Sequence, residues 1–259
     1  MIQRSTVGSL LRSMQAFCGQ LCEKETLEYG IVYCCPRFPT LPEVNQFREV
    51  VIDDAACIPA AFQQAEQAFG ARQVSCRRWA TAGGTPTPEL HRFLSEQGFV
   101  PHSQTAMTLT RWPDPSVSPS VRIIPARAVR EAYRKTFLVE SDSASPQERA
   151  ERADSFGERL DDPSFDAIVA MVDGVPAGRC VLFQVGDIAR VIDLCVGPGF
   201  DGKGVETALL SHALTLAKRL AMRNICTLVE SEDAASLTRL HASGFVEDGV
   251  IVEFERDRL

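Results

Sequence analysis

Apolar residues recur at helical spacing in several stretches of the chain, and each stretch predicts a helix with one face in a core. The first predicted helix follows a cap at Ser5 or Thr6, and a proline opens the second in its first turn. Gly98 ends the third, because glycine readily adopts the backbone that closes a helix. The predicted helices are 7–21, 59–69, 87–98, 126–160 with a break around 141–146, 205–220 and 234–243.

Shorter apolar stretches between these helices predict strands. Asp173-Gly174 is a tight-turn signal, so the strands around it are expected to form an antiparallel meander. The predicted strands are 27–35, 47–53, 74–79, 99–112, 121–125, 165–172, 177–185, 188–196, 225–229 and 245–254. This order of elements predicts an α/β (α+β) fold.

Prolines at 113, 115 and 119 make a stiff segment that is poor in hydrogen bonds and is the best linker in the chain. At roughly 100–150 residues per domain, a chain of 259 residues predicts two domains, which we place at 1–114 and 121–259. The two halves echo one another, since Leu94…Gly98-Phe99 matches Leu240…Gly244-Phe245. The echo suggests a duplicated unit.

The charge balance limits the classes of binding partner, and the cysteines indicate the cellular compartment. The chain carries 27 Lys and Arg against 34 Asp and Glu, which argues against nucleic acid and membrane as partners because both need a cationic face. No apolar run approaches the ~18 residues that span a bilayer. The nine cysteines sit mostly among apolar neighbours, and there are four histidines. We therefore expect reduced core thiols, a cytoplasmic protein and no metal site.

A glycine-rich segment, 196–206, joins a predicted strand to the predicted helix 205–220. Free N–H groups and the helix dipole favour a phosphate at such a place. In the first half, Ala55-Ala56-Cys57-Ile58 precedes the matching helix and contains no glycine. Only the second half therefore has a candidate phosphate site.

Three interpretations of this segment follow from its residues alone. Gly197, Gly199 and Gly202 match a dinucleotide fingerprint, although Glu230 follows the last glycine by more than the roughly 20 residues that are usual. The segment also matches the phosphate loop of nucleotide triphosphatases up to Lys203, but Gly204 replaces the hydroxyl that holds magnesium. A glycine turn that binds nothing is the third interpretation.

The order of motifs in the second half resembles the Gcn5-related N-acetyltransferase (GNAT) family. The resemblance covers about 121–259, and the order and spacing of its motifs together are specific. Those motifs are Asp173-Gly174-Val175-Pro176-Ala177-Gly178, Ile192-Asp193-Leu194-Cys195-Val196-Gly197-Pro198 and Asp233-Ala234-Ala235-Ser236-Leu237…Gly244-Phe245. The first half looks like a partial copy of the same unit.

The resemblance implies two tandem acyl-CoA N-acyltransferase-like domains with mixed, mostly antiparallel sheets flanked by helices, and acetyl-CoA as cosubstrate. That family parts its fourth and fifth strands, lays acetyl-CoA in the gap and holds the pyrophosphate on backbone amides. Asp193, on the strand before the loop, is the candidate catalytic residue. The implied cofactor-binding residues are Val196, Gly202, Lys203, Gly204, Val205, Glu206 and Asp233.

Two acidic residues depart from the family pattern. A cation or amide of that pattern falls on Asp201 and a small residue on Glu206, so two carboxylates stand beside the implied pyrophosphate and Lys203 offsets only part of their charge. The tyrosine that often serves as acid falls on Leu240. The neighbouring His241 points about 100° away on a helix.

Two classes of function remain open. One is an N-acetyltransferase in which a small-molecule or peptide amine attacks the thioester directly. The other is a catalytically inactive binding or regulatory protein that has lost acetyl-CoA. The sequence leaves the acceptor and the oligomeric state open, with a homodimer as one candidate. In the first half, Glu43, Asn45 and Arg48 are candidates for a polar cleft, and a solvated loop is the alternative that we favour.

Overall fold

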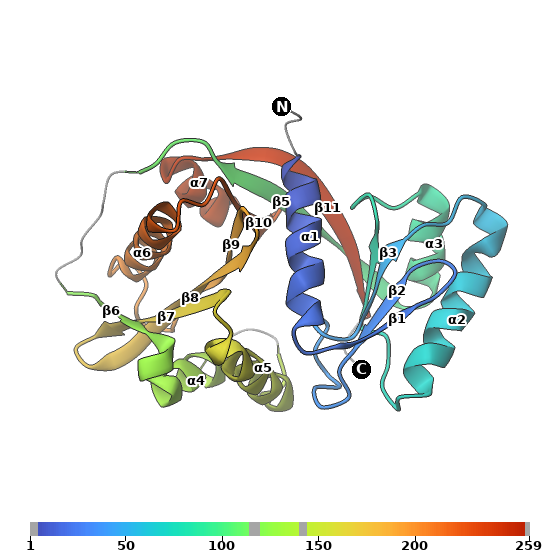
Figure 1. Ribbon diagram of the computed structural model, residues 1–259, viewed down its shortest axis with the longest axis horizontal. Helices are drawn as coiled ribbons and strands as arrows, with labels where there is room; N and C mark the ends of the chain where they lie inside the picture. The colour runs from blue at the N-terminus through green and yellow to red at the C-terminus, as the bar shows by residue number, and fades with distance from the viewer. Residues whose placement is uncertain (1–4, 114–119, 140–143, 257–259) are drawn as a thin grey trace. The chain divides into compact units, whose positions relative to one another are not determined.

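The computed structural model describes residues 5–113, 120–139 and 144–256, and its contacts divide the chain into two compact units (Figure 1). Unit 1 comprises Met1–Ala106, Val229–Ala234 and Asp248–Leu259, and unit 2 comprises Met107–Leu228 and Ala235–Glu247. Strands β5 (Phe99–Leu109) and β11 (Phe245–Arg256) therefore contribute to both units. Most of the predicted linker lies outside the described residues, and the boundaries 1–114 and 121–259 stay a prediction.

Unit 1 contains a mixed sheet in the order β1-β2-β3-β4-β11, in which β3 and β4 are parallel and the other neighbours antiparallel. Its other elements are β1 (Glu23–Thr26), β2 (Ile31–Cys34), β3 (Gln46–Val50), β4 (Arg78–Thr81), α1 (Thr6–Gly19), η1 (Ala55–Cys57), α2 (Ile58–Gly70) and α3 (Pro88–Glu96). Helices α2 and α3 lie on one side of these strands and α1 on the other (Figure 1). On the α2 side, the ring centroid of Trp79 lies 4.7 Å from that of Phe47 and 5.9 Å from that of Phe62.

The α1 side of this sheet carries a buried ion pair. The side chains of Arg48 in β3 and Glu253 in β11 are 2% and 3% exposed, and their charged atoms lie 2.8 Å apart. Arg78 of β4 also approaches Glu253, at 3.3 Å, and Arg48 contacts the sulfur of Met14 in α1 at 3.7 Å. Because a buried charge without a partner is unfavourable, these contacts are satisfied only when β3 and β11 flank β4.

The favoured expectation of a solvated loop at 43–48 is wrong. Asn45 is fully buried, and its side-chain amide donates to the carbonyls of Phe38 at 2.7 Å and Leu41 at 3.2 Å. Its side-chain oxygen accepts from the N–H of Cys35 at 3.0 Å. Asn45 therefore fastens the preceding loop to the sheet. Arg48 serves the buried ion pair, so both polar residues are structural.

Unit 2 contains a mixed sheet in the order β6-β7-β8-β9-β10, in which β9 and β10 are parallel and the other neighbours antiparallel. Helix α6 covers one face of this sheet and α4 the other (Figure 1). Along β8, Gly178 faces α6 and the next residue, Arg179, contacts Phe137 in α4. The elements are β6 (Arg122–Pro125), η2 (Ala126–Ala128), α4 (Arg130–Leu138), α5 (Pro146–Glu158), η3 (Arg159–Asp161), β7 (Phe165–Val172), β8 (Val175–Val185), β9 (Ile188–Val196), α6 (Val205–Arg219), β10 (Asn224–Glu230) and α7 (Ala234–Ala242).

Most of the predicted elements are confirmed, including the antiparallel meander of β7, β8 and β9. The Ser5 cap is also confirmed, since its hydroxyl accepts from the N–H of Gly8 at 3.1 Å. The predictions differ from the structure at two strands. The polar strand β1 was not predicted, because most of it is exposed and carries no apolar face. The strand predicted at 74–79 begins only at Arg78, as β4. Among the described helices, none is long and apolar enough to cross a membrane.

The echo between the halves corresponds to repeated structure. In each unit a helix connects two parallel neighbouring strands, β3-α2-β4 in unit 1 and β9-α6-β10 in unit 2. A further helix then follows, and a glycine with positive φ stands between its end and a long strand, Gly98 at 79° in unit 1 and Gly244 at 90° in unit 2. Both units therefore follow the same order of elements.

The buried pair in unit 1 leads to a stability prediction. Replacing Glu253→Gln leaves buried guanidinium groups without their carboxylate, so we expect a loss of about 3–5 kcal/mol in the free energy of unfolding. The control is Glu23→Gln, which removes a carboxylate with a side chain 68% exposed and only 3.3 Å from Arg72. That variant should change stability by less than about 1 kcal/mol. Urea unfolding followed by tryptophan fluorescence measures both, and equal losses would contradict the prediction.

Candidate functional site

The loop between β9 and α6 folds on itself through its own contacts. The N–H of Phe200 donates to the carbonyl of Gly197, and the N–H of Lys203 donates to the carbonyl of Phe200, both at 3.2 Å. The ammonium of Lys203 lies 4.8 Å from the ring centroid of Phe200. Three glycines with left-handed backbone make these successive turns accessible, namely Gly199, Gly202 and Gly204 with φ of 81°, 72° and 75°.

The first turn of α6 offers N–H groups to a ligand. Gly204 is the N-cap and has no side chain to accept from them, and the first helical hydrogen bond runs from Ala208 to Gly204 at 3.0 Å. Among the described residues, the N–H groups of Val205, Glu206 and Thr207 have no acceptor. Together with the helix dipole, these groups favour an anion at the start of α6.

The acidic residue next to this turn is paired. A carboxylate oxygen of Glu206 lies 2.8 Å from the guanidinium of Arg239 in α7, and the same guanidinium donates to the hydroxyl of Ser236 at 2.8 Å. The side chain of Glu206 is 28% exposed and that of Arg239 49%. The pair is therefore solvated but compensates one of the two carboxylates that oppose an anion here. The other, Asp201, is exposed.

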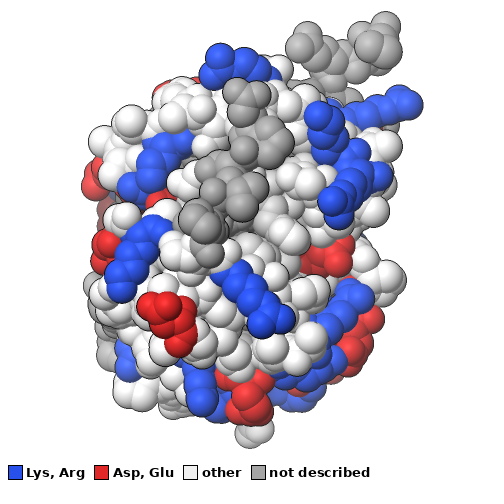
Figure 2. Space-filling model, turned by 90° about the vertical axis from the view of Figure 1, so that its left-hand side faces the viewer, with Lys and Arg blue, Asp and Glu red and all other residues white. Residues whose placement is uncertain are grey.

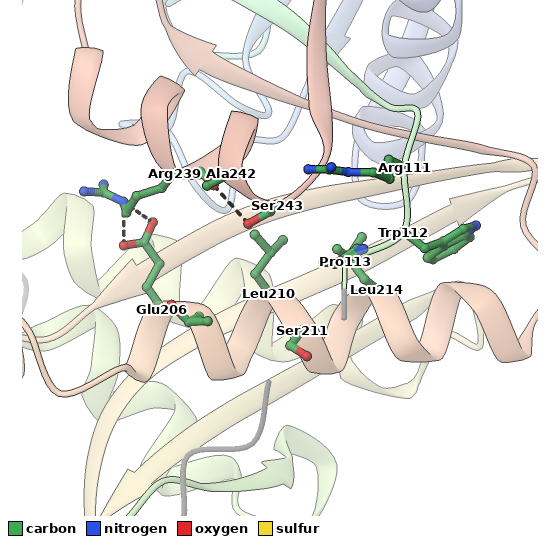
Figure 3. A pocket seen from close by; sticks show the side chains of 11 residues that line it. Arg111, Trp112, Pro113, Glu206, Leu210, Ser211, Leu214, Arg239, Ala242 and Ser243 are labelled. Carbon is green, nitrogen blue, oxygen red and sulfur yellow. Dashed lines mark hydrogen bonds and ion pairs between the residues drawn. The ribbon is translucent and has the colours of Figure 1, made fainter. Parts of the chain in front are cut away.

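A groove of about 530 Å³ lies beside the pair, between α6, α7 and the segment 111–113 (Figure 3). The Glu206–Arg239 pair lies toward one end of it and Trp112 toward the other (Figure 3). Leu210 and Leu214 of α6 give the lining an apolar part, while hydroxyl groups and the cation of Arg111 make the rest polar. The groove can thus accept a ligand that is part apolar and part anionic.

The wall at 111–113 is fixed by the glycine of the Gly-Phe motif. The N–H groups of Thr110 and Arg111 both donate to the carbonyl of Gly244, at 3.0 and 3.2 Å. A Cβ on residue 244 would lie only 1.9 Å from the carbonyl oxygen of Arg111. A glycine is therefore required here by the close approach of two backbones. Trp112 in turn lies 5.6 Å from the ammonium of Lys218, at the end of α6.

Strand β9 carries a bulge just before the loop. Arg179 pairs with Cys195 and Val181 with Ile192, so Cys180 alone faces two residues of β9. The first of these, Asp193, has a φ of 53°. Its two carboxylate oxygens accept from Nε and Nη2 of Arg179 at 2.5 and 2.8 Å.

On its other side, β9 pairs with β10 over a short register. That register runs from Asn224↔Ile188 to Cys226↔Arg190, and one step further the hydroxyl of Thr227 donates to the carbonyl of Val191 at 2.9 Å. Within the described part of unit 2, the remainder of β9 up to Val196 pairs with β8 alone. The end of β9 that leads into the loop therefore has one open edge.

The structure brings most of the residues that we predicted for the site into one region of unit 2. Val196 ends β9, 202–206 form the loop and the first turn of α6, and Asp193 lies in the bulge. The N–H of Lys203 is used within the loop. Asp233 belongs to unit 1, where its N–H donates to the carbonyl of Glu230 at 2.9 Å.

Three arginines near these residues were missed by the sequence analysis. Arg239 and Arg111 line the groove, and Arg179 holds Asp193. No motif or spacing marks them, because their places in the groove and beside Asp193 follow from how separate elements come together in the fold. His241 is a surface histidine, as expected: its side chain is 44% exposed, whereas the neighbouring Leu240 is buried. Its ring contacts Glu247 at 3.1 Å and the carbonyl of Phe245 at 3.2 Å.

Residues 126–245 match the family model described as acetyltransferase (GNAT) family. The matched segment runs from η2 to the start of β11 and includes the bulge, the loop, α6 and α7. This part of the chain is a domain of the GNAT acetyltransferase family, as its motifs predicted. A comparison with curated proteins finds no match.

Solved structures with the same fold cover nearly the whole chain. A functionally unknown conserved protein from Staphylococcus epidermidis has a TM-score of 0.72 and 12% identity, covering 92% of this chain and 95% of its own. A GCN5-related N-acetyltransferase from Kribbella flavida has a TM-score of 0.66 and 12% identity, covering 98% and 96%. A third, a GCN5-related N-acetyltransferase from Sphaerobacter thermophilus, has a TM-score of 0.57 and 15% identity, covering 91% of this chain and 83% of its own. At these identities the likeness concerns the fold, and the predicted α/β fold is confirmed.

The charges around α6 lead to a prediction for anion binding. Arg239→Gln leaves the carboxylate of Glu206 uncompensated beside the first turn, so inorganic pyrophosphate should bind about fivefold more weakly, while Glu206→Gln should strengthen its binding by a similar factor. Calorimetry at low ionic strength measures both, with Arg219→Gln at the far end of α6 as the control. If all three variants bind pyrophosphate equally, the anion does not bind at the start of α6.

Proposed function

We propose that this protein is an N-acetyltransferase that moves the acetyl group of acetyl-CoA to an amine. The observation that carries the proposal is the first turn of α6, whose N–H groups have no acceptor among the described residues. They follow a glycine loop, and the groove lies beside them. The membership of 126–245 in the GNAT family supports acetyl-CoA as the anionic cosubstrate.

In this proposal the backbone provides most of the contacts with the cofactor. The pyrophosphate accepts from the N–H groups of Gly202 and of Gly204 through Glu206, whereas Lys203 contributes its ammonium because its N–H is already used. The backbone of Val196, at the open edge of β9, contacts the pantetheine arm and the acetyl carbonyl.

The proposed reaction needs few side chains. The lone pair of the amine attacks the thioester carbon, so that a C–N bond forms and, through a tetrahedral intermediate, the C–S bond breaks. The amine nitrogen loses one proton to a base or water, and the thiolate of CoA takes one up as it leaves. Backbone N–H groups stabilise the oxyanion, and the alignment of the two reactants supplies much of the rate.

The acceptor in this proposal is a small-molecule or peptide amine. On the face shown in Figure 2, Lys and Arg side chains are interspersed with Asp and Glu, so no single sign of charge selects an acceptor there. The net charge of -7 gives a mild preference for a cationic amine.

A second candidate is an inactive binding or regulatory protein with the same fold. Two features favour it: the exposed carboxylate of Asp201 stands where the family pattern has a cation or amide, and Leu240, which is 6% exposed, occupies the position of the tyrosine acid. A protein that had lost acetyl-CoA would retain the sheet and the helices without these groups.

Calorimetry with acetyl-CoA distinguishes the two candidates. We expect micromolar affinity in the wild-type chain, and no heat at millimolar ligand would favour the inactive protein. Gly204→Ala places a Cβ at a φ of 75° and should weaken binding about tenfold, because left-handed backbone is unfavourable for alanine. The matched control is Gly186→Ala in the turn between β8 and β9, with a φ of 59° and no atom within 4 Å of where its Cβ would stand. Equal effects of the two substitutions would contradict the placement of the cofactor on this loop.

A further inference from the structure

An ion pair between Arg179 of β8 and Asp193 stabilises the bulge of β9. Nε and Nη2 of Arg179 donate to the two carboxylate oxygens, so the pair is bidentate, and the side chains are 1% and 14% exposed. Such a pair has a defined geometry as well as a strong attraction. It holds Asp193 in a left-handed backbone that most side chains adopt only at a cost.

Arg179 is itself anchored in α4. Its third nitrogen, Nη1, donates to the carbonyl of Thr136 at 2.8 Å, and its guanidinium lies 3.7 Å from the ring centroid of Phe137. All three nitrogens of the guanidinium thus have partners. The bulge is therefore tied through one side chain to the helix on the far face of the sheet, opposite α6.

The bulge determines where the backbone leading into the loop lies. Directly after it, the carbonyl oxygen of Cys195 passes within 2.5 Å of where a Cβ of Gly178 would stand. The N–H of Gly197 then donates to the carbonyl of Ala177 at 2.8 Å. Between these two fixed points lies Val196, whose backbone carries the contact with the thioester in the proposed function.

We propose that Arg179 and Asp193 form a positioning pair that holds the backbone of 194–196 in the orientation needed by the acetyl group. The inference rests on the proposed function. In it, Asp193 does not touch the substrate but positions the backbone through its ion pair with Arg179. A base would need a carboxylate oxygen directed at the amine, whereas both oxygens of Asp193 accept from a guanidinium that stays charged.

The test compares acetyl-CoA with CoA, because only the first carries the carbonyl that the positioned backbone recognises. Asp193→Asn and Arg179→Met are expected to reduce the affinity for acetyl-CoA by about twofold to tenfold, the value of one hydrogen bond, and to leave the affinity for CoA within twofold of wild type. Hydrogen exchange of the backbone amides of 194–197 should become faster in both variants. Both measurements use the full chain.

Tyr133→Phe is the matched control. Tyr133 is 1% exposed and packs against Phe137, and its hydroxyl has no hydrogen-bond partner among the described residues. Its removal should change neither the ratio of the two affinities nor the exchange rates. If Asp193→Asn does not fold, Arg179→Met combined with Asp193→Asn removes both charges together and carries the same expectations.

The outcomes separate this inference from the proposed function. If the wild-type chain binds neither ligand, the proposed acetyltransferase function is contradicted. The hydrogen-exchange rates then still test whether the Arg179–Asp193 pair holds the backbone of 194–197. A chain that binds both ligands, with the affinity ratio unchanged in Asp193→Asn and Arg179→Met, overturns the positioning role. Loss of acetyl transfer in Asp193→Asn with an unchanged ratio and unchanged exchange also overturns it, and would assign Asp193 as the base.

Discussion

The site in unit 2 depends on the missing side chain at Gly178. A Cβ there would lie 2.5 Å from the carbonyl oxygen of Cys195, 3.0 Å from Val205 and 3.2 Å from Leu209. The end of β9 and the first turns of α6 therefore both close in on this one position of β8. Because protein interiors are densely packed, any larger residue would displace the strand, the helix or both. The loop joins these two elements, so its placement follows from the same contact.

The equivalent helix of unit 1 starts without a glycine loop. Its helix α2 is preceded by the 3₁₀ turn η1, and the carboxylate of Asp54 accepts from the N–H of Ala56 at 2.9 Å. Pro59, in the first turn of α2, has no N–H to offer. Asp54 thus caps η1, and the N–H of Ile58 donates to the carbonyl of Ala55 in that turn, whereas Cys57, the N-cap of α2, makes no side-chain hydrogen bond. The start of α2 is therefore partly occupied by the preceding turn and by a proline. Unit 2 places glycine at the corresponding position, which leaves the N–H groups available to a ligand.

The sequence predicted those features of the fold that depend on neighbouring residues. The cap at Ser5, the turn at Asp173-Gly174 and the glycine before β11 each reflect a backbone requirement of neighbouring residues, and the structure contains them. The pairing of Glu206 with Arg239 could not be predicted in the same way, because the two residues lie on different helices and 33 positions apart in the sequence. A sequence pattern identifies Glu206 as an obstacle to an anion. Only the folded arrangement, in which Arg239 of α7 reaches Glu206 of α6, supplies the opposite charge.

The same distinction between local and distant contacts explains how unit 1 is completed. Glu253 supplies the carboxylate for Arg48, and β11 pairs with β4 through Glu253↔Ala80 and Phe254↔Trp79. Segments more than 170 positions apart in the chain must therefore meet before this sheet is closed, and contacts of such separation form slowly. A segment that ended at residue 114 would lack β11 and leave Arg48 buried without its carboxylate. Unit 1 therefore needs β11 to complete its sheet and its buried ion pair, although most of its residues come from the first half.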